Sequence, residues 1–239
     1  MPNLRVVAIP VTFNEERKIG SVLDRFREGD VERIVVVDDG STDATPQTIE
    51  SRGAGILRHP VRRGVGAAIR TGIDWARANK FDVAVIVAGN DKDRPQEIPR
   101  LLEPIVNDGC HVVQGSRYLP GGSYGNMPAY RRVATQMLHP MLLSVLARQR
   151  MTDSTNGFRA IRLDLFDDER MNLHQEWLDH YELEPYILYK ALTLGYRVRE
   201  VPVTKIYPDA SLGYTKMKPF VGWWEMLSPL FLLATGLRR

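Results

Sequence analysis

The feature that most constrains the fold is the alternation of short β-branched runs with amphipathic segments in the first half of the chain. Runs that are apolar at nearly every position indicate strands buried on both faces, as in parallel sheets. Between the first two runs, Ile19, Val22 and Leu23 recur at helical spacing, and Asn14 is the expected N-cap of that helix. The expected strands are 4–9, 33–38, 55–59, 81–88 and 111–115.

This alternation predicts a doubly wound α/β sheet with right-handed crossovers. No internal repeat or low-complexity linker divides the chain, so we expect one domain over residues 1–218, followed by an apolar tail over 219–239. In open α/β sheets, ligands bind beyond the carboxyl ends of the strands. Polar clusters follow four strands at these ends: PVTFNEE (10–16), DDGSTD (38–43), GNDKD (89–93) and QGSRY (114–118).

Composition narrows the class of protein. With 44% hydrophobic and 26% charged residues, the chain has the composition of a globular protein. A net charge of only +3, without a long basic run, argues against nucleic acid as a partner. Cys110 is the only cysteine and the N-terminal segment lacks the signal-peptide pattern, so we expect a cytoplasmic, non-secreted protein. No run reaches the roughly 18–20 apolar residues of a membrane span.

The cluster DDGSTD has more acids than a helix start requires. Asp43 suffices as a helix cap. Asp38 and Asp39 are therefore expected to accept hydrogen bonds from ring N–H or hydroxyl groups of a ligand.

Glycines precede the helix expected near residues 66–79. They allow backbone N–H groups at Gly64 to approach phosphates, and Arg62 or Arg63 can pair with the same phosphates. Helix initiation with solvated arginines explains the segment equally well.

The triplet Asp91-Lys92-Asp93 directly follows a buried strand. Carboxylate oxygens suit a hard divalent cation such as Mg²⁺ or Mn²⁺, with water and a diphosphate completing its ligands. A solvated loop is the default interpretation of such a triplet, but its position at a strand end favours a metal site.

These segments, together with NGFR (156–159) and GYRVREVPV (195–203), resemble family 2 glycosyltransferases over residues 4 to about 218. The resemblance is greatest to the dolichyl- or polyprenyl-phosphate hexose transferases. It implies a GT-A fold and inverting transfer of a hexose from a GDP- or UDP-linked sugar to a polyprenyl phosphate. A soluble small-molecule or natural-product acceptor stays open as an alternative. So do two other classes of protein, a sugar nucleotidyltransferase and a non-catalytic nucleotide-sugar-binding module.

The resemblance also implies roles for individual residues. With the acids and glycines above, the expected nucleotide-sugar-binding set is Pro10, Phe13, Glu15, Asp38, Asp39, Arg63, Gly64, Asn90 and Asp91. The residues expected to meet the acceptor phosphate or donor diphosphate are Arg117, Arg131, Thr135, Arg159 and Lys216. Arg159 is expected in a loop that faces the same site. Asp93, Arg117 and Arg131 are the expected catalytic residues.

One departure from the family pattern falls on the acidic loop. The pattern D-A-D-L-Q-H-P-P places two acids and a glutamine near the metal. Aligned without a gap, these three places become Ala88, Asn90 and Lys92. A one-residue deletion instead gives Asp91 and Asp93, and this register is preferred because it keeps two oxygen ligands. Asn90 is then a supporting group, and Lys92 points at the diphosphate.

The acceptor decides whether a base is needed. A phosphate monoester is already anionic near neutral pH, so its attack requires no strong general base, and no convincing Ser/His/Asp constellation is present. An alcohol acceptor requires one, and Glu184, Asp153 and Asp93 are the candidates.

The tail contains WWEMLSPLFLL (223–233), with a tryptophan pair at one end and two arginines beyond the other. This pattern favours peripheral membrane contact through residues 220–239. A dimer contact or an ordinary core helix explains it equally well, so a homo-oligomer stays open.

Overall fold

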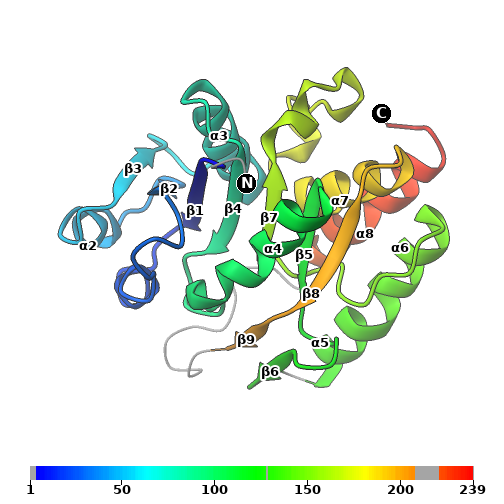
Figure 1. The fold of residues 1–239 in the computed structure, drawn as a ribbon, viewed down its shortest axis with the longest axis horizontal. Coiled ribbons are helices and arrows are strands. Elements are labelled where there is room, and N and C mark those ends of the chain that lie inside the picture. The colour runs from blue at the N-terminus through cyan, green and yellow to red at the C-terminus, as the bar shows by residue number, and fades with distance from the viewer. Residues whose placement is uncertain (1–3, 128, 208–220, 239) are drawn as a thin grey trace.

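The computed structural model describes residues 4–127, 129–207 and 221–238, and its centre is a seven-stranded sheet (Figure 1). The strand order is β3-β2-β1-β4-β7-β5-β8, and β7 alone among these runs antiparallel to its neighbours. The strands of this sheet are β1 Val6–Thr12, β2 Arg33–Asp38, β3 Gly55–Arg58, β4 Val83–Ala88, β5 Val112–Ser116, β7 Arg159–Arg162 and β8 Val198–Pro202.

Helices cover both faces of the sheet. The α-helices are α1 Ile19–Leu23, α2 Thr45–Glu50, α3 Val65–Ala78, α4 Ile98–Asp108, α5 Ala129–Val133, α6 His139–Ala147, α7 Leu183–Thr193 and α8 Val221–Ala234. A π-helical turn, η2 Ala134–Leu138, joins α5 to α6. The 3₁₀ turns are η1 Pro95–Glu97, η3 Leu163–Asp167, η4 Glu169–Met171 and η5 Glu176–Leu178.

Alternate strand residues point into two separate cores, as the pleat of a strand requires. In β1, Val7 and Ile9 belong to a core with residues of α3 and α7, whereas Ala8 belongs to a core with residues of α1 and α4. All three side chains are fully buried. The β-branched runs of the sequence thus form a sheet covered on both faces, and the mostly parallel α/β prediction is confirmed.

Two local predictions are wrong. Asn14 does not cap a helix, because α1 begins only at Ile19 and Asn14 adopts a left-handed φ of 51°. Its side-chain oxygen instead accepts the backbone N–H of Thr42 at 2.8 Å, which ties the loop after β1 to the loop after β2. Arg159 begins strand β7 and does not lie in a loop.

Beyond the carboxyl ends of the main strands lies a two-stranded parallel sheet, β6 Ser123–Gly125 and β9 Thr204–Ile206, toward the lower edge of Figure 1. The chain reaches β9 almost directly from β8, so residues from near the end of the chain come beside the loop after β4. The backbone N–H of Ile206 donates to the carbonyl of Lys92 at 3.0 Å.

The apolar tail forms helix α8, which packs against α6 and α7. Met226, Leu230 and Leu233 are buried, while Trp224 and Phe231 are exposed. This segment is therefore a core helix with an exposed side. In the described part of the chain, no helix is long and apolar enough to span a bilayer. The expected boundary at residue 218 lies outside the described residues and stays a prediction.

Candidate functional site

A cavity of about 570 Å³ lies where β1, β2, β4 and β5 end. All four polar clusters of the sequence contribute to its lining, together with residues from α5, η2, α7 and β9. The expected site residues that it brings together are Phe13, Glu15, Asp39, Asn90, Arg117, Arg131 and Thr135. Their roles toward a ligand stay predictions, but their common location is the one that a doubly wound sheet provides.

Asp39 is the fixed acid at one side of the cavity. Its Oδ1 accepts the backbone N–H of Arg63 and lies 2.8 Å from Nδ1 of His59, while its Oδ2 accepts the N–H of Gly64 at 2.9 Å. Because an ionised carboxylate offers about four acceptor positions, a ligand donor can still bind there. Asp39 therefore connects the segment before α3 to the end of β2, and one of its acceptor positions can still receive a hydrogen bond from a ligand in the cavity.

Several expected nucleotide contacts lie outside this cavity. Asp38 is fully buried and accepts the backbone N–H of Ser41 at 3.2 Å, so it closes the turn after β2 and makes no contact with the cavity. Gly64, at φ 116°, is required by packing, because an added Cβ would collide with the carbonyl of Asp179. Arg63 contributes only its backbone N–H to Asp39.

Pro10 is likewise not part of the lining. It lies inside β1, paired with Val87 of β4, and its missing N–H explains why the β1–β2 ladder skips two residues there.

The loop after β1 supplies an aromatic surface to the cavity. The guanidinium of Arg62 lies 4.4 Å from the ring centroid of Phe13, and both residues line the cavity. Glu15 is buried and forms an ion pair with Lys18 at 2.8 Å. A flat aromatic ring beside buried polar groups suits a nucleoside, since a base stacks on such a surface and its ribose hydroxyls seek acceptors.

The opposite end of the cavity is strongly basic. Nζ of Lys92 and Cζ of Arg131 lie 4.6 Å and 5.6 Å from the ring centroid of Tyr207, so two cations converge on one ring. Lys205, on β9, lines the cavity with them. Burial, and then repulsion by Lys205, Arg131 and Lys18, lowers the pKa of Lys92 to about 7. Such crowding of positive charge favours an anionic ligand.

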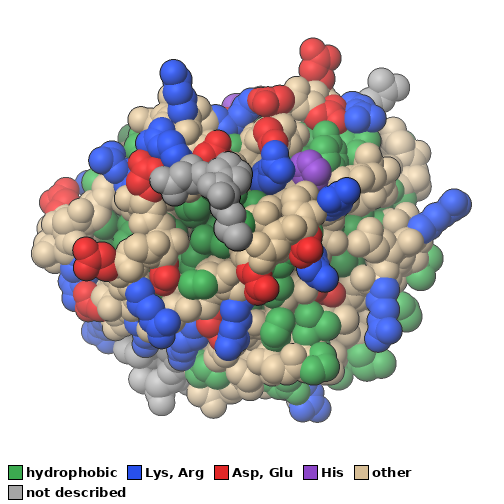
Figure 2. Space-filling view, viewed as in Figure 1, with side chains coloured by type: hydrophobic (Ala, Val, Ile, Leu, Met, Phe, Trp, Pro, Cys, Tyr) green, Lys and Arg blue, Asp and Glu red, His purple; other side chains and the backbone are tan. Residues whose placement is uncertain are grey.

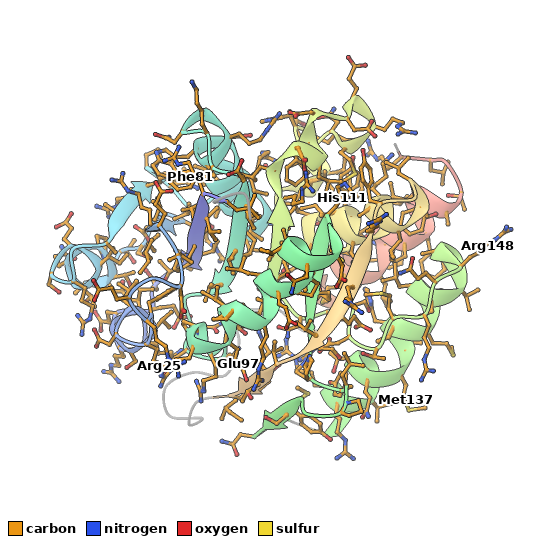
Figure 3. The ribbon with its side chains drawn as sticks, viewed as in Figure 1. Arg25, Phe81, Glu97, His111, Met137 and Arg148 are labelled. Carbon is orange, nitrogen blue, oxygen red and sulfur yellow. The ribbon has the colours of Figure 1, made fainter. Side chains whose placement is uncertain are left out.

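Asp91 and Asp93 are turned away from the cavity. Asp93 is 1% exposed, and its Oδ1 lies 2.5 Å from Nζ of Lys205 while its Oδ2 accepts the N–H of Ala88 at 2.8 Å. Asp91 forms an ion pair with Arg25, which Figure 3 shows near the start of α4. Neither acid lines the cavity. These contacts contradict the assignment of both residues as metal ligands and of Asp93 as a catalytic group.

The residues of this loop that do line the cavity are Ala88, Asn90 and Lys92. They are the positions of the ungapped register, so the cavity lining favours that register over the shifted one. Asn90 offers the only side-chain oxygen of the three, and Lys92 is a cation. In the described part of the chain, no three His, Cys, Asp or Glu side chains are grouped to hold a metal. These donors do not fit Mg²⁺ or Mn²⁺, which prefer carboxylate oxygens.

Two buried oxygens at the cavity lack a protein partner in the described structure. They are Oδ1 of Asn90 and Oγ1 of Thr12, and both residues line the cavity. Buried polar atoms in proteins are almost always hydrogen-bonded. These two are therefore positioned for donor groups of a ligand, such as sugar hydroxyls.

Arg117 is held rigidly at the cavity wall. Its Nε and Nη2 donate to the two oxygens of Asp153 at 2.6 and 2.7 Å. Burial alone lowers the pKa of Arg117, but Asp153 outweighs it and the net shift is upward. The neighbouring Tyr118 hydroxyl lies 2.6 Å from Oγ1 of Thr135, which aligns the π-helical turn with β5.

Arg159 does not contact the cavity, contrary to its expected phosphate role. It is almost fully buried and its Nη1 and Nη2 donate to the carbonyls of Glu184 and Asn156 at 3.0 and 2.8 Å. It also pairs with the carboxylate of Glu184, which does line the cavity. Arg159 thus positions Glu184. Lys216 lies outside the described residues.

The sequence interpretation missed some lining residues. Lys205 and Tyr207 stand two apart in VPVTKIYP, and a period of two would have predicted that both point to one side of an extended segment. The missed residues include Thr12, Lys18, Tyr181, Lys205 and Tyr207.

A mostly parallel sheet with a cavity at the carboxyl ends of its strands, lined by aromatic rings, acids and cations, is the layout of a ligand-binding doubly wound α/β protein. Residues 7–170 match the family model described as glycosyl transferase family 2, and the chain belongs to this family. It is 31% identical over 222 residues to undecaprenyl-phosphate mannosyltransferase of Micrococcus luteus, covering 90% of this chain and 88% of that protein. It is 33% identical over 214 residues to dolichyl-phosphate hexose transferase of Haloferax volcanii, covering 88% and 86%.

Solved structures confirm the GT-A fold. Glucosyl-3-phosphoglycerate synthase from Mycobacterium tuberculosis, in complex with Mn²⁺, UDP and glucosyl-3-phosphoglycerate, superposes with a TM-score of 0.70. The alignment covers 99% of this chain and 82% of that one, at 19% identity. At this identity the likeness establishes the fold alone.

Proposed function

We propose that the protein transfers a hexose from a nucleoside diphosphate sugar, GDP- or UDP-linked, to a polyprenyl phosphate with inversion at the anomeric carbon. The observation that carries the proposal is the single cavity that joins Asp39 and Phe13 to the basic group of Lys92, Arg131 and Lys205. One end suits a nucleoside and the other suits phosphates. Relatives that match most of the chain are named for transfer to undecaprenyl and dolichyl phosphate.

The acids near the site favour a phosphate acceptor over an alcohol. Asp93 is paired with Lys205, Asp153 with Arg117, and Glu184 with Arg159. In each of these pairs a carboxylate oxygen is already bonded to a protein cation. An alcohol acceptor would need one of them to take its proton, whereas a phosphate oxygen is already ionised.

The chemistry then depends on position and charge. A phosphate oxygen of the acceptor attacks the anomeric carbon, and the bond from that carbon to the donor diphosphate breaks on the opposite side. Its electron pair stays with the departing nucleoside diphosphate. Lys92 and Arg131 stabilise that developing charge, and Arg117 holds the acceptor side of the cavity at fixed geometry.

The outer side of the α5–η2–α6 segment supports contact with a membrane. Val133, Met137, Met141 and Val145 recur at every fourth residue and are 54 to 69% exposed. Figure 2 shows hydrophobic side chains gathered at the lower right, where Figure 1 places α5 and α6. The same segment contributes Arg131 to the cavity.

This segment, which we call the apolar ridge (residues 133–145), lies between exposed arginines at 132, 148 and 150. Apolar side chains flanked by arginines suit an anionic bilayer surface. We infer that the ridge rests on the membrane and admits the lipid phosphate beside Arg131. Helix α8, which packs against α6, carries the exposed Trp224 and Phe231.

A transfer assay tests the proposal. The protein is incubated with radiolabelled GDP-mannose, UDP-glucose or UDP-N-acetylglucosamine and a short polyprenyl phosphate, and lipid-extractable label and released nucleotide are measured together. We expect lipid-linked hexose and one nucleoside diphosphate per transfer. Release of pyrophosphate would indicate a nucleotidyltransferase. Label on a soluble acceptor alone, or nucleotide-sugar binding without turnover, would also overturn the proposal.

A further inference from the structure

The loop after β4 presents a cation to the cavity at the edge where the family pattern predicts a metal. Lys92 is 6% exposed, and its carbonyl is held by the N–H of Ile206 on β9. The acids on either side point elsewhere, into ion pairs with Arg25 and Lys205. Lys92 is therefore the charged residue of this loop that lines the cavity, while ion pairs hold the two acids beside it.

The neighbours of Lys92 make this end of the cavity unfavourable for a second cation. Lys92 and Arg131 share the ring of Tyr207, and Lys205 and Lys18 are close enough to lower the pKa of Lys92. A divalent ion beside Lys92 and Arg131 would meet repulsion from both, and neither Asp91 nor Asp93 lines the cavity to offset it. A diphosphate, in contrast, would have its charge neutralised by side chains that are already in place.

We propose that Lys92, with Arg131, takes the place and the charge of the divalent cation, so that this protein binds its nucleoside diphosphate sugar and stabilises the leaving diphosphate without Mg²⁺ or Mn²⁺. The inference rests on the proposed function, because it names how the same cavity holds its donor. A bound diphosphate favours the protonated form of Lys92, and protonated Lys92 with Arg131 carries the same formal charge as one divalent ion. Unlike a metal, they are supplied by the fold itself, and the basic end is assembled before the ligand arrives.

Ligand binding tests the proposal independently of turnover. Calorimetric titration of the wild-type protein with GDP and UDP, in EDTA and in Mg²⁺ or Mn²⁺, gives the affinity with and without metal. We expect the affinity for the cognate nucleotide in EDTA to lie within about threefold of that in metal. A loss of more than about tenfold in EDTA, restored by metal, would overturn the inference.

Variants assign the effect to Lys92. Replacing Lys92→Gln should weaken nucleoside diphosphate binding in EDTA by about 10- to 100-fold, because a charge-assisted contact is lost. Binding of the nucleoside without phosphates should stay unchanged. Lys92→Arg should retain most of the affinity. Lys80→Gln is the matched control, because this exposed lysine precedes the start of β4, whereas Lys92 follows its end. Equal loss for nucleoside and diphosphate would contradict the role. Circular dichroism and thermal unfolding verify that each variant is folded.

The converse experiment rebuilds a carboxylate site. The combined variant Ala88→Asp, Asn90→Asp and Lys92→Gln places two acids and an amide at the three positions that line the cavity. We expect its nucleotide binding to become Mn²⁺-dependent. Its electron paramagnetic resonance spectrum should show protein-bound Mn²⁺ that the wild type lacks. Protein-bound Mn²⁺ of equal affinity in the wild type would refute the inference.

The proposed function and this inference fail in different ways. If the wild type binds nucleoside diphosphate equally well with and without metal but transfers no hexose to polyprenyl phosphate, the function fails and the inference stands. If transfer occurs but both binding and transfer disappear in EDTA, the inference fails and the function stands.

Discussion

At the scale of single residues, the buried pair of Asp93 and Lys205 is structural. Lys205 also donates to Oδ1 of Asn156 at 3.0 Å, so it links the loop after β4 with the loop before β7. Both side chains are buried, and the attraction between them offsets the cost of removing each charge from water. The pair therefore holds the shape of the cavity edge beside Lys92.

This structural role predicts an effect on stability. Asp93→Ala should lower the free energy of unfolding by about 3 kcal/mol, because it leaves the ammonium of Lys205 buried without its partner. The double variant Asp93→Leu with Lys205→Met should recover much of that loss. Urea unfolding followed by circular dichroism measures both. Loss of transfer in Asp93→Ala with unchanged unfolding would show that the acid acts on the ligand.

Glu184 distinguishes the two kinds of acceptor. It lines the cavity and is positioned by Arg159. If the acceptor is a phosphate, Glu184→Gln should reduce kcat less than about tenfold, because no general base is required and the amide still accepts from Arg159. Removal of a true general base costs about 10²- to 10⁴-fold. Steady-state transfer assays, with Glu176→Gln at an exposed site as the control, separate these outcomes.

At the scale of elements, His139 of α6 connects this helix to α8. Its Nδ1 lies 2.6 Å from the hydroxyl of Ser154, and its Nε2 lies 3.0 Å from the carbonyl of Met226 in α8. Burial lowers the pKa of His139, although the bond to Met226 and the charge of Asp153 oppose the shift. The imidazole is thus neutral in the folded protein and links α6 to α8.

The direction of this shift predicts how stability depends on pH. Below about 6.5, the ordinary pKa of histidine, the unfolded chain binds a proton that the folded protein does not, so stability falls as pH falls through this window toward the lowered folded pKa. The slope for one proton is at most about 1.4 kcal/mol per pH unit. We expect His139→Gln to have a flatter dependence between pH 7.5 and 5. Urea titrations at each pH measure it, and equal slopes in both proteins would contradict the assignment.

The apolar ridge gives a prediction about membrane binding. Figure 3 shows Met137 at the outer side of this segment, away from the sheet. Replacing Met137→Glu together with Met141→Glu should weaken binding to anionic lipid vesicles by about tenfold or more, because two exposed apolar contacts become negative charges. A double mutant is preferable to removing residues 220–239, since α8 buries Leu230 and Leu233 in the core.

Sedimentation with phosphatidylglycerol vesicles measures this binding. Val106→Glu, on α4 and 42% exposed, is the control for a general effect of an added acid. If the double variant and the control bind vesicles as the wild type does, the ridge is not the membrane contact.

At the scale of the whole molecule, the elements predicted correctly from the sequence are those with a regular hydrophobic pattern. Strand 33–38 matches β2 at both ends, because a run of β-branched residues has one stable environment, the centre of a covered sheet. Strand β7 was not predicted, because its sequence RAIR begins and ends with arginine, and only the tertiary partner Glu184 makes Arg159 a core residue.

The site was predictable in location but not in every contact. Strand ends located the cavity, since ligands bind at that edge whatever the side chains. Which residues of GNDKD face it depended on the register, and the cavity lining favours the ungapped register over the one that chemical preference selected. The deciding contact was Asp93 with Lys205, more than a hundred positions later in the chain. Such long-range pairing leaves no local pattern in the sequence.

The position of Lys205 on β9 has a consequence for synthesis on the ribosome. The segment that matches the family model ends at residue 170, well before β9 emerges. Until then, Asp93 has no counter-charge, and the carbonyl of Lys92 lacks the strand that fixes it. A growing chain can thus form most of its sheet while its phosphate-binding end is still incomplete. On the proposed function, the cavity can bind a donor sugar only after β9 has been synthesised.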